Sequence, residues 1–478
     1  MHSGKHTKIV ATLGPASEDP ETITHMIKAG VNVFRFNMKH NTNEWHVEKI
    51  KIVRNISKEL NIPVGVLIDL QGPEIRIETQ KDIQVEKGDH VFFVNDFSEV
   101  KELSRETSLT QEPKVVKISE KIVLDTLDIE DQFSIDDGFL EFEIVECFGN
   151  GFIAKSLDNG VISDHKSLNL IGKDVALPSL VEKDLERLDI AAKAAVDFVA
   201  LSYVRTQKDV VELKKEMSSR NLKAKIVAKI ESEKGIDNID EIIDESDVVM
   251  VARGDLGVEM PIERIAYLQK TIINKCRSKN KQVIVATQML QSMTVSSRPT
   301  RAEATDVSNA VYDGADAVML SAESATGKYP VKSVEVMRRI LKFNETHSQV
   351  FEVAPHNKDQ TNTIVKAAVS ILEFNWAKID KVIVFTETGY TANALSSYRI
   401  KIPVVAVSED VATVESLTID YGVHPAVMKF PHGQFEFSSV EDQLLGLELV
   451  KKGERVLVIH GRQWKDPGKT NALFILQV

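Results

Sequence analysis

Eight short apolar runs, separated by segments of helical pattern, constrain the fold of this 478-residue chain more than any other feature. The runs are almost continuously apolar, as expected for parallel strands that are covered on both faces. They occupy residues 8–13, 31–37, 64–69, 197–202, 225–231, 247–251, 282–287 and 317–321. Eight such strand–helix units predict an α/β fold, a (β/α)8 TIM barrel.

Seven of the eight runs end in, or just before, a polar residue that can take part in chemistry. These residues are Arg35, Asn37, Asp69, Ser202, Lys229, Glu231, Asp255, Thr287, Ser321 and Glu323. A TIM barrel builds its active site from residues at the C-terminal ends of its strands. We therefore expect these side chains to converge on one face of the barrel.

The run at 225–231 ends in Lys229-Ile230-Glu231. Residues i and i+2 of a strand point to the same side, so the ammonium and the carboxylate should project together. One unit later, Gly254 and Asp255 open a helix, whose N-terminal N–H groups attract anions. A lone Lys-x-Glu is more often a solvated ion pair. Two carboxylates for a divalent metal, a lysine and an anion-binding loop are nevertheless the components of phosphoryl transfer.

The chain is expected to form three domains, because the barrel pattern is interrupted once and later replaced. Short alternating runs and turns such as Gly149-Asn150-Gly151 predict β-hairpins between the third and fourth strands, in a lid over the active site. A helical pattern and further apolar runs restart near the C-terminus. The expected domains are a catalytic barrel (1–72 and 178–345), an inserted β-barrel lid (73–177) and a C-terminal α/β domain (346–478).

Composition narrows the class of protein. The net charge of −12 argues against nucleic acid and anionic membranes as partners. No apolar run reaches the length of a membrane span, and the N-terminus lacks a signal-peptide pattern. The two cysteines give no disulfide framework, so we expect a cytoplasmic protein.

Several segments together resemble pyruvate kinase, over nearly the whole chain. They are TLGPAS at 12–17, FRFNMKH at 34–40, GPEIR at 72–76, AKIES at 228–232, VARGDLGVE at 251–259, ATQML at 286–290, RPTRAEATD at 298–306 and DGADAVMLSAESA at 313–325. This family transfers the phosphoryl group of phosphoenolpyruvate to ADP, giving pyruvate and ATP in glycolysis. The resemblance implies that activity and a homotetramer.

The resemblance also assigns roles to residues at the strand ends. Glu231 and Asp255 match the ligands of Mg²⁺, or Mn²⁺ in its place, and Lys229 matches the lysine that stabilises charge on the phosphoryl group in transfer. The backbone at Gly254 and Asp255, with the Thr287 hydroxyl, matches the cradle of the substrate carboxylate. Arg35 matches a phosphate-binding arginine.

Two further groups of residues follow from the same resemblance. The residues near the nucleotide phosphates are Asn37, His40, Arg76 and Lys166, the last on a looser alignment of the lid. Proton delivery to the enolate is matched by Thr287, Ser321 and Glu323. For Ser321, a purely structural role at the strand end is an equal alternative.

The monovalent cation site departs from the family pattern. Members that need K⁺ use an Asn, a Ser two residues later, an Asp and the carbonyl of the next residue, which match Asn37, Lys39, Asp69 and Leu70 here. The ammonium of Lys39 would lie where K⁺ lies, and two cations repel strongly at that distance. We therefore predict that K⁺ is not required. In the alternative, Lys39 turns to solvent and pairs with Glu74 while K⁺ still binds.

The C-terminal domain resembles the effector domain of the family. Thr386, Thr388 and Thr391 fall where a sugar-phosphate or nucleotide effector would place its phosphate, at the start of a helix. Glu387 adds a negative charge to this loop, which argues against a bisphosphate. A helix start without any ligand is an equal alternative.

Two other functions stay open at this stage. A different phosphoenolpyruvate-using barrel enzyme should lack the lid and the C-terminal domain. A non-catalytic, metabolite-sensing relative should have lost Lys229, Glu231, Asp255 or Thr287, and all four are present.

Overall fold

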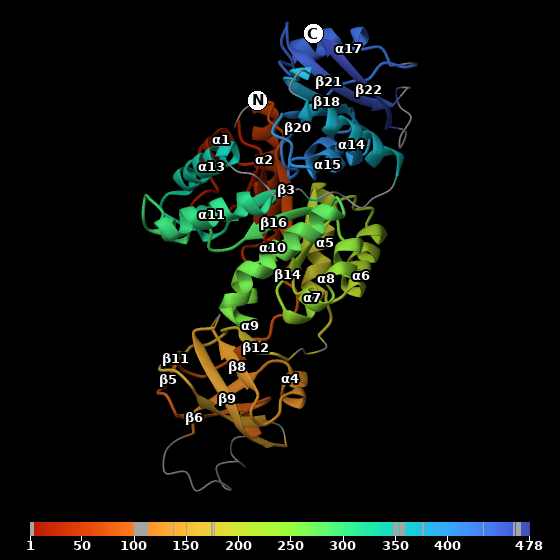
Figure 1. The fold of residues 1–478 in the computed structure, drawn as a ribbon. Helices are drawn as coiled ribbons and strands as arrows, with labels where there is room; N and C mark the ends of the chain where they lie inside the picture. The colour runs from red at the N-terminus through yellow and green to blue at the C-terminus, as the bar shows by residue number, and fades with distance from the viewer. Residues whose placement is uncertain are drawn as a thin grey trace.

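The computed structural model describes residues 4–99, 113–136, 138–149, 151–173, 175, 177–347, 353, 359–374, 377–433, 435–461, 464 and 470–478. Three bodies follow one another in space, with the inserted β-domain at one end, the barrel in the middle and the C-terminal domain at the other end (Figure 1). Since the inserted domain and the C-terminal domain lie at opposite ends, each can act on a different end of the barrel.

The central body is a closed barrel of eight parallel strands, in the order β1-β17-β16-β15-β14-β13-β3-β2. The strands are β1 (Lys8–Thr12), β2 (Val33–Asn37), β3 (Gly65–Asp69), β13 (Phe198–Leu201), β14 (Lys225–Ile230), β15 (Val248–Ala252), β16 (Gln282–Ala286) and β17 (Ala317–Leu320). Six of them are buried along their entire length, and β14 and β2 are buried except at one and two residues, respectively, which explains why the sequence runs are apolar on both faces. The predicted TIM barrel is confirmed.

Amphipathic helices cover the outside of the barrel. They are α1 (Pro20–Ala29), α2 (Asn43–Leu60), α5 (Glu182–Ala194), α6 (Gln207–Ser219), α7 (Glu233–Asp237), α8 (Ile239–Glu245), α9 (Arg253–Glu259), α10 (Ile262–Ser278), α11 (Arg301–Asp313), α12 (Ala322–Ala325) and α13 (Pro330–His347), with the 3₁₀ turn η2 (Gln291–Thr294). Local signals set their ends: Asp19 accepts the N–H of Thr22 at the start of α1, and Gly30 takes φ 121° after its last residue.

The inserted body is a β-domain. Its described strands form a seven-stranded sheet, β12-β8-β9-β10-β6-β7-β4, and a two-stranded sheet, β11-β5. The elements are β4 (Ile77–Glu78), β5 (Ile83–Val85), β6 (His90–Val94), η1 (Phe97–Glu99), β7 (Val115–Ile118), α4 (Lys121–Thr126), β8 (Gln132–Ile135), β9 (Leu140–Phe148), β10 (Gly151–Ser156), β11 (Gly160–Ile162) and β12 (Leu168–Leu170). Its core is aromatic, with Phe93, Phe133, Phe142 and Phe152 in mutual ring contact.

The C-terminal body is a five-stranded α/β sheet of order β20-β19-β18-β21-β22. Its elements are α14 (Gln360–Glu373), β18 (Lys381–Phe385), α15 (Tyr390–Ser396), β19 (Val404–Ser408), α16 (Val411–Ser416), β20 (Val423–Val427), α17 (Ser438–Gly446), β21 (Arg455–Gly461) and β22 (Thr470–Gln477). The sequence predicted the central strands and missed β20 and β22. β20 has no long apolar run because it carries His424 and Pro425, whereas β22 contains the apolar run 472–476, which the sequence analysis overlooked.

The C-terminal domain closes the N-terminal end of the barrel. Ile419 is fully buried and belongs to the apolar cluster inside the barrel, together with Val10, Phe198 and Met250. The C-terminal ends of the strands face the other way, toward the inserted domain (Figure 1). The polar residues that follow the strands therefore lie between the barrel and the lid.

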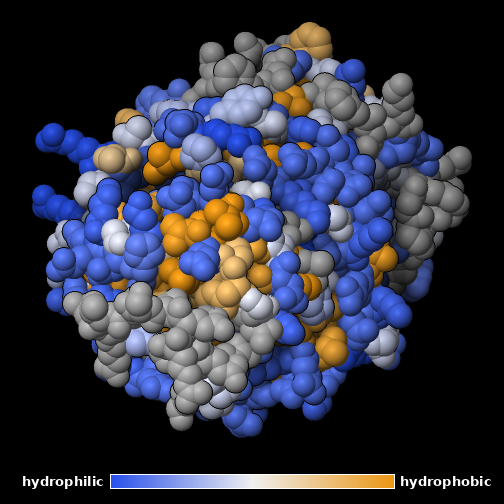
Figure 2. Space-filling view, turned by 90° about the horizontal axis from the view of Figure 1, so that it is seen from below, coloured by the Kyte–Doolittle hydropathy of each residue, from blue (hydrophilic) through white to orange (hydrophobic). Residues whose placement is uncertain are grey.

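Seen from the side of the inserted domain, the surface is largely hydrophilic, with a hydrophobic patch near the middle of this face (Figure 2). No helix in the described part of the chain is long and apolar enough to cross a membrane.

Candidate active site

Asp69, the last residue of β3, lies at the centre of a buried charge network. Its Oδ2 is 2.6 Å from Nη2 of Arg35, and its Oδ1 is 3.2 Å from Nζ of Lys229. Arg35 also donates from Nη1 to Oγ1 of Thr12, at 3.0 Å. Burial alone would raise the pKa of Asp69, but the charges of Lys229 and Arg35 hold it below its ordinary value. Asp69 is thus an ionised carboxylate that fixes the position of two cations.

Lys229 and Glu231 project to the same side of the barrel, as the strand period predicts. The Nζ of Lys229 is 2.9 Å from Oε1 of Glu231 and donates to Oγ of Ser202 at 2.8 Å. Burial disfavours the charge of Lys229, yet Asp69, Glu231 and Asp255 together raise its pKa above the ordinary value. The site therefore contains a permanent, almost fully buried ammonium group.

Glu231 and Asp255 form the carboxylate pair that the sequence predicted. Glu231 is buried, and its Oε2 accepts the backbone N–H of Tyr203 at 2.6 Å. Burial, followed by the charge of Glu231, raises the pKa of Asp255 to about 7, against the opposing effect of Lys229 and Lys39. A pair of carboxylates in which the charge of Glu231 disfavours the ionisation of Asp255 fits a divalent cation.

A metal ion bound to this pair would need further ligands from outside the protein. Across the described residues, no group of three or more His, Cys, Asp or Glu side chains is arranged to hold an ion. Mg²⁺ suits such a site, since it commonly keeps water and substrate phosphate oxygens beside one or two carboxylates.

Thr287, the residue after β16, bends back toward α9. Its Oγ1 accepts the N–H of Gly254 at 2.7 Å and donates to the carbonyl of Ala286 at 2.7 Å. A Cβ at position 254 would lie 3.3 Å from this hydroxyl oxygen, so glycine permits the close approach. The residues expected to hold the substrate carboxylate are thus brought together.

Ser321 and Glu323 follow β17 as expected, but the contacts of Glu323 are structural. Its Oε1 accepts the N–H of Leu290 at 3.0 Å, and its Oε2 accepts the N–H of Ser321 at 2.8 Å. Glu323 is fully buried and ties the loop after β16 to the loop after β17. Its part in proton delivery remains a prediction.

Lys39 does not contact the acceptors that the sequence suggested. Its Nζ lies 3.8 Å from Oε1 of Glu74 and 5.9 Å from the ring centroid of Tyr203. Asn37 Oδ1 instead accepts the backbone N–H of Lys39, at 3.2 Å. Asp69 is not its partner because Arg35 and Lys229 already occupy both oxygens of that carboxylate. The Lys39 side chain is about a quarter exposed, so it pairs with Glu74 without being turned fully out to solvent.

The expected nucleotide residues lie on both sides of the cleft. His40 is an exposed side chain beyond β2. Arg76 comes just before β4 and Lys166 just before β12 in the inserted domain, where the N–H of Ile77 donates to the carbonyl of Lys166 at 3.0 Å. Each cation has a carboxylate partner: Arg76 lies 2.9 Å from Glu74, and Lys166 lies 2.8 Å from Asp136. These pairs would have to open for phosphate to bind.

Comparison with known proteins decides the family. The model described as "Pyruvate kinase, barrel domain" matches residues 4–334, and "Pyruvate kinase, alpha/beta domain" matches residues 362–476. The chain belongs to the pyruvate kinase family. A different phosphoenolpyruvate-using barrel enzyme is thereby excluded.

Curated pyruvate kinases are similar along almost the entire chain. That of Clostridium acetobutylicum is 36% identical over 477 residues, which are 98% of each chain. Those of Staphylococcus aureus (strain MRSA252) and Staphylococcus saprophyticus are 35% identical over 484 and 485 residues, which are 98% of this chain and 80% of the relative. As a member of the pyruvate kinase family, the chain is a phosphotransferase.

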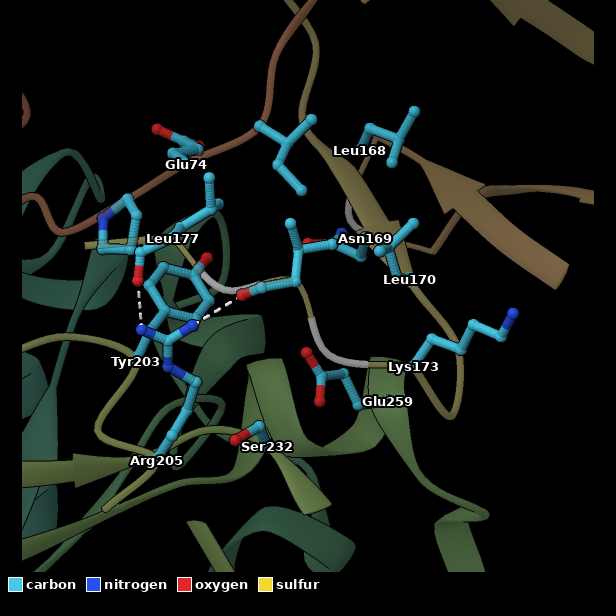
Figure 3. Close-up of a pocket in the computed structure, with 13 residues that line it drawn as sticks. Glu74, Leu168, Asn169, Leu170, Lys173, Leu177, Tyr203, Arg205, Ser232 and Glu259 are labelled. Carbon is cyan, nitrogen blue, oxygen red and sulfur yellow. Dashed lines mark hydrogen bonds between the residues drawn. The ribbon is translucent and has the colours of Figure 1, made fainter. Parts of the chain in front are cut away.

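The pyruvate kinase domains enclose a pocket that the sequence did not predict, with a volume of about 550 Å³ including its open mouth. Residues of the barrel loops, such as Tyr203 and Glu259, face Leu168 and Leu170 of the inserted domain across it (Figure 3). Arg205 donates from Nη1 to the carbonyl of Val175 at 2.6 Å, and from Nη2 to that of Leu177. It thereby ties the barrel to the chain returning from the lid.

In the expected effector loop of this pyruvate kinase fold, the threonine hydroxyls already form hydrogen bonds within the protein. Thr386 and Thr391 are buried; the hydroxyl of Thr386 accepts the N–H of Gly389 at 2.9 Å, and that of Thr391 lies 2.8 Å from Oγ1 of Thr470. Thr388 is exposed. The resemblance also places a flap at residues 468–471, beside this loop, of which residues 468 and 469 lie outside the described residues.

Sequence reasoning passed over several residues that shape the site. Tyr203 has φ +54° and donates its N–H to Glu231. Only Glu231 belongs to a motif that the sequence analysis recognised. Thr12 anchors Arg35 from the end of β1. Its place at the end of a strand, as the first residue of TLGPAS at 12–17, was the available signal.

Proposed function

We propose that this chain is a pyruvate kinase that transfers the phosphoryl group of phosphoenolpyruvate to ADP. The observation that carries the proposal is the position of the Lys229 ammonium, within 3.2 Å of Asp69, 2.9 Å of Glu231 and 2.8 Å of Ser202. The phosphoryl group carries its charge on three oxygens during transfer, and a fixed, buried cation stabilises that charge without reorganisation.

Glu231 and Asp255 would hold the divalent ion, Mg²⁺ or Mn²⁺. When bound, the ion would supply positive charge that offsets the charge developing on the phosphoryl group in transfer. Arg35 is held by Asp69 and Thr12, so its remaining N–H groups are oriented in advance for the phosphate of phosphoenolpyruvate.

The substrate carboxylate is assigned to the backbone of Gly254 and Asp255 and to the Thr287 hydroxyl. The N–H of Gly254 and the hydroxyl of Thr287 now bond to each other at 2.7 Å. Both would turn toward the carboxylate when it binds, which would fix the enolate for protonation. Thr287 and Ser321 are the assigned hydroxyls for that proton relay.

We assign the role of the monovalent cation to Lys39. The oxygens that would ligate K⁺ already have protein partners. Asn37 Oδ1 accepts the N–H of Lys39, and the Asp69 carboxylate pairs with Arg35 and Lys229. The Leu70 carbonyl accepts the Ser202 hydroxyl at 2.8 Å. Burial and Glu231 raise the pKa of Asp255, and the charge of Lys39 opposes this rise, so its field reaches the metal carboxylates. A tethered ammonium spares the entropy of capturing an ion.

Assembly and regulation follow the family expectation. Ile262 and Tyr267 on α10 are 80% and 70% exposed, large apolar side chains that a homotetramer would cover. A sugar-phosphate or nucleotide effector would bind near Thr386, Thr388 and Thr391 only if the hydroxyl contacts of this loop were exchanged. The proposed place of the reaction is glycolysis in the cytoplasm.

The proposed reaction is tested by supplying the purified chain with phosphoenolpyruvate, ADP and Mg²⁺ and measuring pyruvate and ATP independently. Both products should appear in equal amounts, and omission of ADP or Mg²⁺ should stop the reaction. A chain that binds phosphoenolpyruvate but forms neither product would favour the metabolite-sensing alternative.

A further inference from the structure

Thr287 and Gln288 form a backbone bend that is strained by itself. Their φ angles are +68° and +53°, in the left-handed region that side chains rarely adopt. Thr287 is β-branched, which makes this conformation still less favourable. Such a conformation persists only where its surroundings hold it. Some other group must therefore fix this bend.

Arg253, the first residue of α9, is that group. Its Nη2 donates to the carbonyl of Thr287 at 2.7 Å, and its Nε donates to the carbonyl of Ala286 at 3.3 Å. One guanidinium thus bonds the two carbonyls that flank the start of the bend. The side chain is 12% exposed, so water competes little for these bonds.

The other edge of the same guanidinium is anchored on two helices. Nη1 lies 2.6 Å from Oδ1 of Asp306 on α11 and 3.3 Å from Oε1 of Gln269 on α10. Because the guanidinium is planar and rigid, these anchors determine where Nη2 and Nε point. The bend is consequently held in a fixed position relative to α10 and α11.

A simple ion pair between Arg253 and Asp306 does not account for this arrangement. The Asp306 carboxylate is about one third exposed, and such a pair is worth little by itself. A lysine would satisfy it equally well. Only the fork of an arginine reaches Asp306 and the Thr287 carbonyl together.

We propose that Arg253 is a positioning residue that sets the orientation of the Thr287 hydroxyl for substrate binding. This inference rests on the proposed function. With the Thr287 carbonyl fixed on one side, Oγ1 is directed to the other side, where it meets the N–H of Gly254 at 2.7 Å. Loss of the fork lets the bend relax to negative φ and moves the hydroxyl away from the substrate carboxylate.

The test is a double-mutant cycle between Arg253→Lys and Thr287→Val, with Asp306→Asn as the matched control. Arg253→Lys should raise KM for phosphoenolpyruvate about tenfold or more while KM for ADP changes less than about threefold. Asp306→Asn removes the charge of the ion pair but keeps an Oδ1 acceptor for Nη1 and both carbonyl bonds, so it should change either value less than about threefold. In the Thr287→Val background, Arg253→Lys should add almost nothing, since both act through one hydroxyl.

Additive losses in the cycle, or equal losses in Arg253→Lys and Asp306→Asn, would overturn the inference while the wild-type enzyme remained active. An inactive wild type would overturn the proposed function and this inference with it. Thermal unfolding of each variant reports on folding. If Arg253→Lys does not fold, Arg253→Gln, whose short amide cannot reach Asp306 and the Thr287 carbonyl together, replaces it in the same cycle, with the same two outcomes.

Discussion

The Nζ atom of Lys39 lies 3.8 Å from Oε1 of Glu74, while the nearby carboxylate of Asp69 is held by Arg35 and Lys229. A cation therefore stands at the mouth of the site without using the oxygens that a K⁺ ion would take. Its charge still acts on Asp255. This relationship leads to the prediction most particular to this chain.

We predict activity without K⁺. In a buffer free of K⁺ and Na⁺, with a bulky organic cation as counter-ion, the wild type should keep most of its activity. Lys39→Ser should lose it and recover in part when K⁺ is added, because the serine restores an oxygen and removes the competing charge. The exposed Lys51→Ser is the control. A wild type that is nearly inactive until K⁺ is added would mean that Lys39 only pairs with Glu74 and does not replace the K⁺ ion.

Lys229→Met should lower kcat far more than it raises KM for phosphoenolpyruvate. The reason is that a charge placed on the phosphoryl group in flight acts mainly in the transition state. We expect a loss in kcat of about 10³-fold or more, by analogy with the removal of other preorganised charges. Steady-state kinetics and a thermal melt of the variant provide the measurement. A nearly normal kcat with a greatly raised KM would assign Lys229 to ground-state binding.

Glu415, which lies where the C-terminal domain meets the barrel, should make the free energy of unfolding depend on pH. Burial, followed by the neighbouring Asp197, raises the pKa of Glu415 to about 8, although Arg54 opposes the shift. Between about pH 4.5 and 8 the folded chain holds a proton that the unfolded chain has released, so the free energy of unfolding falls as pH rises.

Glu415→Gln should remove this dependence. The variant should gain stability relative to the wild type as pH rises from 5.5 to 8.5, by on the order of 1 kcal/mol or more. Urea unfolding at several pH values measures the difference, with the exposed Glu48→Gln as control. A difference that does not change with pH would contradict the raised pKa.

Ile419 should stabilise the docking of the C-terminal domain on the barrel. It is fully buried inside the barrel cluster, so Ile419→Ala should cost roughly 2–5 kcal/mol of unfolding free energy. The half-exposed Val411→Ala, on the neighbouring α16, should cost much less. Equal costs for the two variants would mean that burial of Ile419 inside the barrel does not stabilise the docking of the C-terminal domain.

The barrel and its catalytic strand ends were predictable because their physical signals are local. A doubly covered strand must be apolar along its length, and each chemical group stands at the end of such a run, so Lys229, Glu231 and Thr287 could be placed from sequence order alone. The inserted domain was also recognisable, from its turns.

The partners of individual side chains were not predictable. Lys39 could have reached Asp69, Asn37 or Glu74 on sequence grounds, and the choice depended on Arg35 and Lys229 filling Asp69 first. Likewise, the strained φ of Thr287 and the insertion of Ile419 into the barrel arise from contacts between residues far apart in the chain. The pattern of residues along the sequence does not show which of several partners a side chain takes in the fold.

The most direct test of the central claim, a metal-dependent phosphoryl transfer at Glu231 and Asp255, is the Asp255→Asn variant assayed at ordinary Mg²⁺ beside the exposed Asp240→Asn control. Because Asn keeps the shape but removes the charge that would hold the ion, Asp255→Asn should fold normally and lose activity by about 10³-fold or more, while Asp240→Asn stays near the wild type. Wild-type turnover in a folded Asp255→Asn variant would contradict the assignment of this site.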